Sequence, residues 1–253
     1  MTPPAAAKLP VSDDALLGGR VKLLQPTAGY RVAIDPVLLA AAVPAAAGEA
    51  VLDIGCGVGA AALCLAARVP GSRITGIEAQ RDLVRLATEN AARNGVADRV
   101  AIMAGDINHP PPRLEPGHFA HVMANPPYME AETVSPSPLP GKTTATVEGD
   151  ADLAAWVRFA FVMARPRGSI TFIHRADRIE HLLAQFAGRA GGIVVLPLWP
   201  GAGKAAKRVI VHARKDVATP TRLLPGLILH EADGRFTAAA DTVLRDAKAL
   251  SFM

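Results

Sequence analysis

Asn125, Pro126 and Tyr128 are the residues whose types and spacing most directly suggest chemistry, and all three lie in the tetrapeptide 125–128. The Asn125 side-chain oxygen and the Pro126 carbonyl oxygen could accept hydrogen bonds from both N–H groups of an exocyclic amine or a carboxamide. Such a nitrogen is a poor nucleophile because its lone pair is delocalised, so two acceptors would stabilise the positive charge that develops on it. Proline fixes the backbone beside the acceptors, and the Tyr128 ring offers a flat face to a base. The tetrapeptide therefore predicts a catalytic site that acts on the planar nitrogen of an exocyclic amine or a carboxamide.

A glycine-rich turn lies earlier in the chain, where a strand-like run at 51–54 leads into Gly55, Gly57 and Gly59 and then into a helical stretch. Glycines let a backbone approach a ligand closely, and a helix N-terminus offers unpaired N–H groups and a partial positive charge. Gly55, Gly57 and Ala60 also satisfy the dinucleotide fingerprint, so a dehydrogenase has to be considered.

Three acidic residues, Asp53, Glu78 and Asp106, stand at the ends of successive predicted strands. Glu78 could accept both hydroxyls of a ribose, which NAD and S-adenosylmethionine share, and Asp106 could accept from an adenine amino group. Asp53 favours S-adenosylmethionine, because a carboxylate there would repel the pyrophosphate of NAD but suit the ammonium group of a methionine.

Short β-like runs alternate with helical stretches from residue 49 onward. The predicted strands are 50–54, 73–77, 100–104, 118–124, 169–174, 193–197 and 208–213. The predicted helices are 59–68, 80–94, 152–164 and 178–189, the third ended by Pro166 and Gly168. This alternation predicts an α/β fold, a mostly parallel sheet with helices on both faces. Such a sheet binds ligands beyond the carboxyl ends of its strands, where the glycine turn, the acids and Asn125 all fall.

These motifs resemble the class I S-adenosylmethionine-dependent methyltransferases over roughly residues 48–215. The resemblance implies a Rossmann-like, seven-stranded, mostly parallel sheet whose last strand is antiparallel. It implies that the loop from Asp53 through Gly55 and Gly57 holds the methionine portion of the cofactor. It further implies that Glu78 binds the ribose, that Asp106 contacts the adenine and that Ile107 packs on the adenine ring.

A second resemblance narrows the choice of the group that accepts the methyl. Asn-Pro-Pro-Tyr occurs in methyltransferases that act on adenine N6, on guanine N2 and on glutamine amides. Segments around residues 16–20, 24–26, 29–31, 34–40 and 230–237 resemble the tRNA(Val) adenine-N6 methyltransferase group. This implies methylation of the adenine just 3′ of the anticodon, with Asn125 also touching the cofactor. Tyr30, Arg31 and Asp35 are then candidate substrate-side residues, Tyr30 for stacking and the other two for closing the methionine end.

The chain divides into four predicted segments. Residues 1–20 are expected as a flexible tail, 21–47 as a substrate-facing hairpin and helix, 48–215 as the methyltransferase domain and 216–253 as a C-terminal extension packed on it. The hairpin is expected to join 21–24 to 30–34, and Asp35 is expected to cap a helix that reaches about residue 43. The Pro-rich stretch 130–149 is expected to be a long loop, either a substrate loop or a variable insertion.

The amino-acid composition limits the classes of protein to which the chain can belong. The chain has 253 residues, is 50% hydrophobic and carries a net charge of +4, so it is expected to fold and is mildly suited to a polyanion. Two cysteines make neither a disulfide framework nor a four-ligand zinc site, and no metal is expected. No signal peptide or membrane span is apparent, so a cytoplasmic protein is expected, with its oligomeric state left open.

Two basic groups are candidate phosphate contacts. One contains Arg165, Arg167, His174, Arg175 and Arg178, and the other contains Lys204, Lys207 and Arg208.

Other functions remain open on the sequence alone. A protein glutamine N5-methyltransferase would use the same tetrapeptide. An NAD-dependent oxidoreductase, or a non-catalytic cofactor-binding protein, would use the glycine loop without it.

Overall fold

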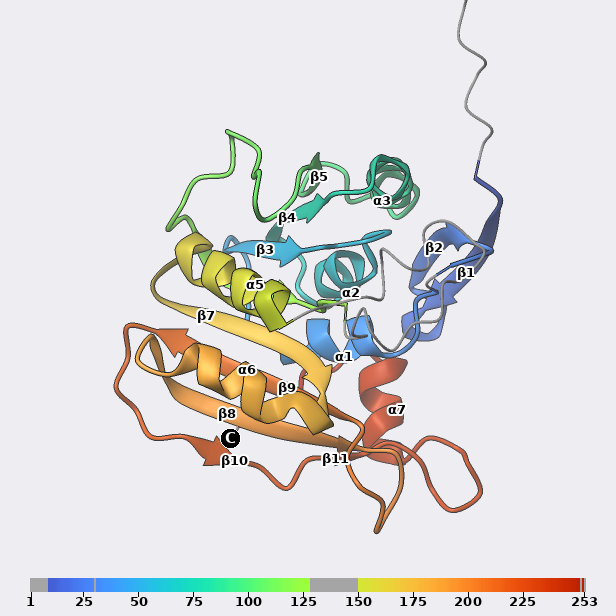
Figure 1. Cartoon of the computed structure of the whole chain (residues 1–253). Helices are drawn as coiled ribbons and strands as arrows, with labels where there is room; N and C mark the ends of the chain where they lie inside the picture. Colours follow the sequence, from blue (N-terminus) through green and yellow to red (C-terminus); the bar gives the residue numbers. More distant parts are fainter. Residues whose placement is uncertain (1–8, 30, 128–149, 251, 253) are drawn as a thin grey trace, which may run out of the picture.

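The computed structural model describes residues 9–29, 31–127, 150–250 and 252 (Figure 1). Tyr30, Tyr128 and the segment 130–149 lie outside the described residues, so the predictions made for them are not tested.

A nine-stranded mixed sheet forms the centre of the molecule, with strands in the order β10-β8-β9-β7-β6-β3-β4-β5 and with β11 also paired to β8 (Figure 1). Its long strands are β3 (Ala50–Ile54), β4 (Arg73–Glu78), β5 (Val100–Ala104), β6 (Phe119–Ala124), β7 (Ala164–Arg175), β8 (Ala190–Trp199) and β9 (Arg208–Lys215). β3, β4, β5, β6 and β7 are parallel, whereas β9 runs antiparallel to both β7 and β8. The predicted α/β class is therefore confirmed, including an antiparallel last strand among the seven predicted ones.

The count of seven strands is too low, because the C-terminal extension also joins the sheet. β10 (Arg222–Leu223) and β11 (Leu227–Ile228) both pair in parallel with β8. Two-residue strands are too short to produce an alternating pattern in the sequence, and that is why they were missed.

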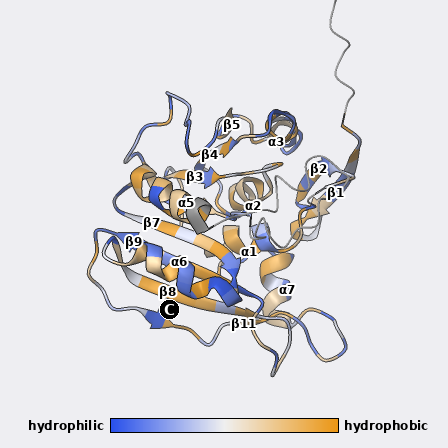
Figure 2. Cartoon of the chain, in the orientation of Figure 1, coloured by the Kyte–Doolittle hydropathy of each residue, from blue (hydrophilic) through white to orange (hydrophobic). Residues whose placement is uncertain are grey.

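Helices cover both faces of the sheet. α2 (Ala60–Arg68), α3 (Arg81–Arg93), α1 (Asp35–Ala42) and α7 (Ala238–Leu244) contribute to one apolar cluster, and α5 (Asp150–Met163) and α6 (Ile179–Phe186) to the other. Neighbouring strand residues alternate between the clusters, as Val51 and Leu52 do in β3. The strands accordingly carry mainly hydrophobic colours in Figure 2, because both of their faces are buried.

The N-terminal segment differs from the prediction. β1 (Val11–Leu16) and β2 (Val21–Pro26) form an antiparallel hairpin through the short helix η1 (Leu17–Gly19), so the expected tail is wrong for residues 11–20. The hairpin does not join 21–24 to 30–34. Asp13 and Asp14 lower the β propensity of the first strand, and their charges are neutralised only by tertiary partners, Arg93 and Arg31.

Two predicted helix boundaries are also corrected. Ile34, rather than Asp35, is the N-cap residue of α1, and the Asp35 carboxylate instead pairs with Arg208 at 2.9 Å. α5 ends at Met163 and β7 already begins at Ala164, so the helix ends before Pro166 and Gly168, which lie inside β7. Within the described residues, no helix combines the length and apolar character needed to cross a membrane.

Candidate active site

The carboxyl ends of four parallel strands bring the predicted site residues together. Ile54 of β3 pairs in register with Ile77 of β4 and with Ala124 of β6, and Glu78 pairs with Ala104 of β5. The residues that follow these strands therefore share one edge of the sheet, which we call the carboxyl edge. The glycine loop, Glu78, Asp106 and Asn125 all lie there, as the sequence predicts.

The glycine loop turns sharply at the end of β3. Gly55, Gly57 and Gly59 have positive φ angles of 64°, 57° and 86°, a backbone conformation that favours glycine. The Cys56 N–H donates to the Ile77 carbonyl oxygen at 2.9 Å, which ties the loop to β4. Gly59 then serves as the N-cap of α2, so the loop presents the N-terminus of that helix to the carboxyl edge.

Glu78 is buried and holds the loop in place. Its two carboxylate oxygens accept hydrogen bonds from the Gly57 N–H at 3.0 Å and from the Gln80 N–H at 2.8 Å. Burial raises the pKa of Glu78 above its ordinary value, although these backbone N–H groups act in the opposite direction. The residue thus links the glycine loop to the start of α3, and a ribose contact by the same carboxylate stays a prediction.

Asp53 is 2% exposed at the end of β3. Among the described residues its Oδ2 atom has no hydrogen-bond partner. Burial raises the pKa of Asp53 to about 8, and the nearby Glu78 carboxylate adds to this rise. A buried carboxylate oxygen without a partner is costly, so a ligand that donates a hydrogen bond or brings positive charge would be stabilised here.

Asn125 directly follows β6 and carries a second unsatisfied acceptor. Its Oδ1 atom is buried and finds no hydrogen-bond donor in the part of the chain that the structure describes. Pro126, which follows, is buried as well. The strand end therefore carries the amide acceptor that the tetrapeptide predicts, while Tyr128 falls outside the described residues.

Asp106 follows β5 and is more exposed than the other two acids. Its Oδ1 atom accepts from the Asn108 N–H at 2.7 Å and from the His109 N–H at 2.9 Å, and Oδ2 lies 3.5 Å from His109 Nδ1. Partial burial acts to raise the pKa of Asp106, but the two N–H groups and His109 lower it below its ordinary value. The neighbouring Ile107 is half-buried and packs against the apolar cluster of α5 and α6.

Trp156 of α5 lies beside the glycine loop, whereas its apolar position in a predicted helix favours a core residue over the alternative of a stacking platform. Its indole lies against Gly55 so closely that a Cβ atom added there would meet Cη2 at 2.3 Å. The side chain is only partly buried. Gly55 thus meets two demands, a positive φ and the contact with the indole, and Trp156 forms one wall beside the glycine loop.

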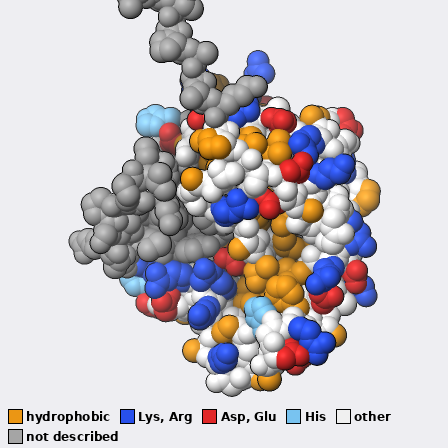
Figure 3. Space-filling view, turned by 90° about the vertical axis from the view of Figure 1, so that its right-hand side faces the viewer, with side chains coloured by type: hydrophobic (Ala, Val, Ile, Leu, Met, Phe, Trp, Pro, Cys, Tyr) orange, Lys and Arg blue, Asp and Glu red, His pale blue; other side chains and the backbone are white. Residues whose placement is uncertain are grey.

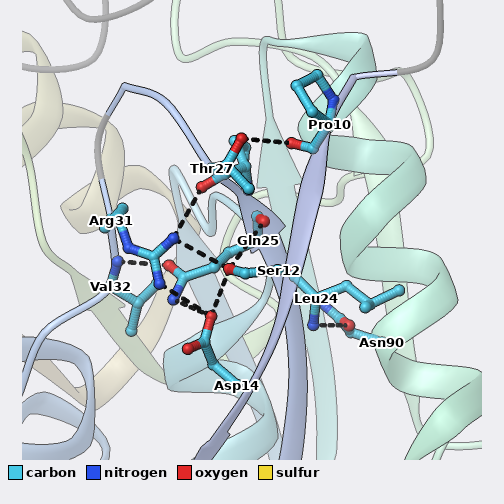
Figure 4. A network of polar contacts seen from close by, with 10 residues as sticks. Pro10, Ser12, Asp14, Leu24, Gln25, Thr27, Arg31, Val32 and Asn90 are labelled. Carbon is cyan, nitrogen blue, oxygen red and sulfur yellow. Dashed lines mark hydrogen bonds and ion pairs between the residues drawn. The ribbon is translucent and has the colours of Figure 1, made fainter.

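Asn90 of α3 is a residue that the sequence missed. It is fully buried and accepts from the Leu24 N–H at 2.7 Å (Figure 4). Its Nδ2 group donates to the carbonyl oxygens of Leu24 and Val58 at 2.9 and 3.0 Å. One side chain therefore joins β2 of the N-terminal hairpin to the glycine loop.

The predicted substrate-side residues Arg31 and Asp35 take part in ion pairs. Arg31 donates to Asp14 and Ser12, each at 3.0 Å, in a network that also includes Gln25 (Figure 4). Asp35 pairs with Arg208, the first residue of β9, which lies at the carboxyl edge because β9 is antiparallel. These pairs hold the hairpin and α1 beside the site, and direct substrate contacts by either residue stay predictions.

The first predicted basic group, which includes Arg165 and Arg175, is spread over opposite ends of β7. Arg165 lies near the amino end of this strand and Arg175 at its carboxyl end, so about 30 Å of extended chain separates them. Arg165 instead pairs with Glu49, just before β3, at 3.1 Å. Arg175 and Arg178 share the carboxyl edge with Lys207 and Arg208, because the Ala176 N–H donates to the Lys207 carbonyl oxygen. No cluster of three metal-ligating side chains is found among the described residues.

The sheet order and the glycine loop agree with the predicted class of protein, the S-adenosylmethionine-dependent methyltransferases with a Rossmann-like fold. Comparison with known proteins agrees. Residues 31–138 match the methyltransferase small domain family. A tRNA1(Val) (adenine(37)-N6)-methyltransferase of Actinobacillus pleuropneumoniae serotype 7 is 28% identical over 218 residues, which cover 83% of this chain and 86% of the relative.

Two solved structures share the fold. A predicted O-methyltransferase from Agrobacterium tumefaciens has a TM-score of 0.71 and 23% identity, covering 86% of this chain and 98% of that chain. A geranyl diphosphate C-methyltransferase from Streptomyces coelicolor, in complex with S-adenosyl-L-homocysteine, has a TM-score of 0.54 and 14% identity, covering 71% of this chain and 78% of that chain. The family match over residues 31–138, the relative and the shared fold support an S-adenosylmethionine-dependent methyltransferase. These comparisons favour the methyltransferase prediction over the oxidoreductase alternative, and they do not test the non-catalytic one.

Proposed function

We propose that this chain transfers a methyl group from S-adenosylmethionine to the exocyclic N6 amine of an adenine in the anticodon loop of a tRNA, in the cytoplasm. The observation that carries the proposal is the buried, unpartnered Oδ1 atom of Asn125 at the end of β6. Together with the Pro126 carbonyl oxygen it would accept both hydrogens of an amino group. The name of the Actinobacillus relative adds the tRNA and the adenine.

The described residues fit the cofactor. Asp53 Oδ2, buried without a partner, suits the ammonium group of the methionine portion, and Gly55 and Gly57 leave the loop backbone open to a ligand. Glu78 would accept from the ribose, and Asp106 and Ile107 would contact the adenine. When bound, S-adenosylmethionine supplies a methyl group that is already activated by the sulfonium.

Asn125 and Pro126 act on the acceptor nitrogen. Transfer of the methyl group from bound S-adenosylmethionine to this nitrogen would place positive charge on it. Two oxygen acceptors on its hydrogens stabilise that charge, so they favour the transition state over the ground state. The methylated nitrogen is acidic and loses its proton to solvent afterwards. We assign Tyr128 to stacking on the target base, with Tyr30, Arg31 and Asp35 on the substrate side.

The direct test is incubation of the purified chain with methyl-labelled S-adenosylmethionine and either total tRNA or total protein. We expect label in tRNA, recovered as N6-methyladenosine after digestion to nucleosides. Label found in protein alone would overturn the proposal.

A second candidate acceptor is a glutamine side chain in a protein, because a carboxamide presents the same pair of N–H hydrogens to Asn125 and Pro126. The protein arm of the same experiment tests it, and N5-methylglutamine in hydrolysed protein would identify it.

A further inference from the structure

Residues 229–237 form a short hairpin that the catalytic site does not use. His230 and Phe236 form an isolated antiparallel bridge across it, and the Glu231 N–H donates to the Arg235 carbonyl oxygen at 2.8 Å. The hairpin is anchored at both ends. The Leu229 N–H donates to the Trp199 carbonyl oxygen at the end of β8, and Thr237 caps α7 by accepting from the Ala240 N–H.

The rings of His230 and Phe236 are stacked, with their centroids 4.8 Å apart and their planes 26° apart. His230 Nδ1 donates to the Pro200 carbonyl oxygen at 3.0 Å, which fixes the orientation of the imidazole. Both side chains are only partly buried. A pre-oriented, partly exposed ring pair is a platform on which a further flat ring can stack at little entropic cost.

This ring pair lies on the carboxyl edge. From β6, which ends just before Asn125, the neighbouring strands are β7, β9 and β8, and Pro200 follows β8 directly. The strand registers place Ala124 level with Val195 of β8, so Pro200 lies four residues beyond the level of Asn125. About 13 Å along the strands and about 14 Å across three strand spacings give about 20 Å between Asn125 and the turn that holds His230. That distance suits a second contact with the molecule that carries the target base.

Cationic side chains accompany the rings. Lys204 and Lys207 lie in the turn between β8 and β9, both exposed, and neither ammonium group forms an ion pair with the residues described here. Gly201, at the start of this turn, lies next to both the Lys204 side chain and the His230 carbonyl oxygen. On this side of the molecule hydrophobic side chains lie among groups of Lys and Arg side chains (Figure 3).

We infer that residues 229–237, with Lys204 and Lys207, form a second RNA contact, in which the His230–Phe236 pair stacks on another unpaired base of the loop that carries the target adenine and the lysines bind the phosphates of that loop. The inference rests on the proposed function. Stacking rings beside phosphate-binding cations are the means by which proteins hold single-stranded nucleic acid. Lysines are depleted from protein–protein interfaces, so this combination fits RNA better than a protein partner.

The test compares Phe236→Leu with the wild-type chain on three RNAs. One is an intact anticodon stem-loop, and the other two carry an abasic residue in the unpaired loop, a few nucleotides to the 5′ side or to the 3′ side of the target adenosine. We expect Phe236→Leu to raise KM for the intact RNA about tenfold, with the affinity for S-adenosylhomocysteine as in the wild type. On the abasic RNA that lacks the stacked base, the two proteins should differ less than about twofold, because the interaction is already absent.

Phe252→Leu is the matched control. Phe252 also stacks on a histidine, His212, with centroids 5.0 Å apart and planes 28° apart, but His212 is a buried residue within β9. This variant should keep the wild-type KM for all three RNAs. The inference is overturned if Phe236→Leu equals the wild type on intact RNA, or if its effect is the same on all three RNAs. If the wild-type chain methylates no RNA at all, it is the proposed function that fails.

Discussion

Polar groups are buried both at the carboxyl edge and at the opposite side of the sheet, where the parallel strands begin and which we call the amino edge. The two edges differ in how these groups are hydrogen-bonded. At the amino edge, His121 Nε2 lies 2.8 Å from Glu49 and Nδ1 lies 2.7 Å from Ser169 Oγ, while Arg165 completes the pairing of Glu49. At the carboxyl edge, Asp53 Oδ2 and Asn125 Oδ1 are buried with no partner among the described residues. The group around His121 is internally satisfied, whereas Asp53 and Asn125 carry acceptor oxygens that a ligand with N–H groups would satisfy.

The difference shows how to separate structure from function among buried polar residues. The amino-edge group superficially resembles a Ser–His–Glu catalytic triad, but Ser169 is 4% exposed, so a substrate could not reach it. The hydrogen bond from His121 holds the pKa of Glu49 below its ordinary value, and burial lowers the pKa of His121 despite this partner. Paired groups of this kind stabilise a fold, whereas unpaired ones lower stability and indicate binding.

The largest expected effect is at the carboxyl edge. Asn125→Ala should lower kcat on tRNA by on the order of 10³-fold, because it removes an acceptor that acts in the transition state. The affinity for S-adenosylhomocysteine should stay within about tenfold, and the free energy of unfolding should not fall, because the lost oxygen has no hydrogen bond. Steady-state kinetics, calorimetry and urea denaturation measure the three quantities. Near-wild-type turnover would remove Asn125 from the mechanism.

Removal of the His121 side chain at the amino edge should instead lower stability and leave kcat unchanged. His121→Ala leaves Glu49 and Ser169 without their partner, so we expect the free energy of unfolding to fall by about 3 kcal/mol. The kcat per folded molecule should equal that of the wild type. Urea denaturation and active-site titration separate the two effects, and a large loss of kcat with unchanged stability would break the comparison between the edges.

Asp53 provides a pH test with a definite sign. Its pKa is raised from an ordinary 3.8 to about 8, so between these values the folded state holds a proton that the unfolded state has released. The contribution of Asp53 to stability therefore falls as pH rises across this window. Relative to Asp53→Asn, the wild-type chain without cofactor should lose roughly 2 kcal/mol of unfolding free energy between pH 5 and pH 7. A pH-independent difference would mean that the buried carboxyl group keeps an ordinary pKa.

The smallest expected effect concerns surface arginines at the two edges. Arg175→Ala, at the carboxyl end of β7, should raise KM for tRNA about threefold and reduce its dependence on salt. Arg189→Ala removes an exposed arginine just before β8, at the amino edge, and should change neither quantity. Equal effects from both variants would argue against RNA binding at the carboxyl edge.

Local patterns account for the parts of the fold that were predicted correctly. β3 and β5 begin and end at the predicted residues, because a short β-branched run followed by a turn is visible without its neighbours. The same holds for the glycine loop, where three glycines in five residues require a special backbone. β1 was missed because Asp13 and Asp14 oppose a strand until Arg93 and Arg31 neutralise them.

The sequence by itself determined the chemistry at this site: an acid, a glycine turn and an Asn-Pro-Pro-Tyr tetrapeptide at predicted strand ends. Only the tertiary structure decided which residues surround that chemistry. Trp156 reaches Gly55 from 101 positions away in the chain, and Asn90 joins Leu24 to Val58. β7 separates arginines that are neighbours in the sequence by its whole length. Such contacts depend on how the sheet and its helices pack, and short-range patterns in the sequence carry no information about them.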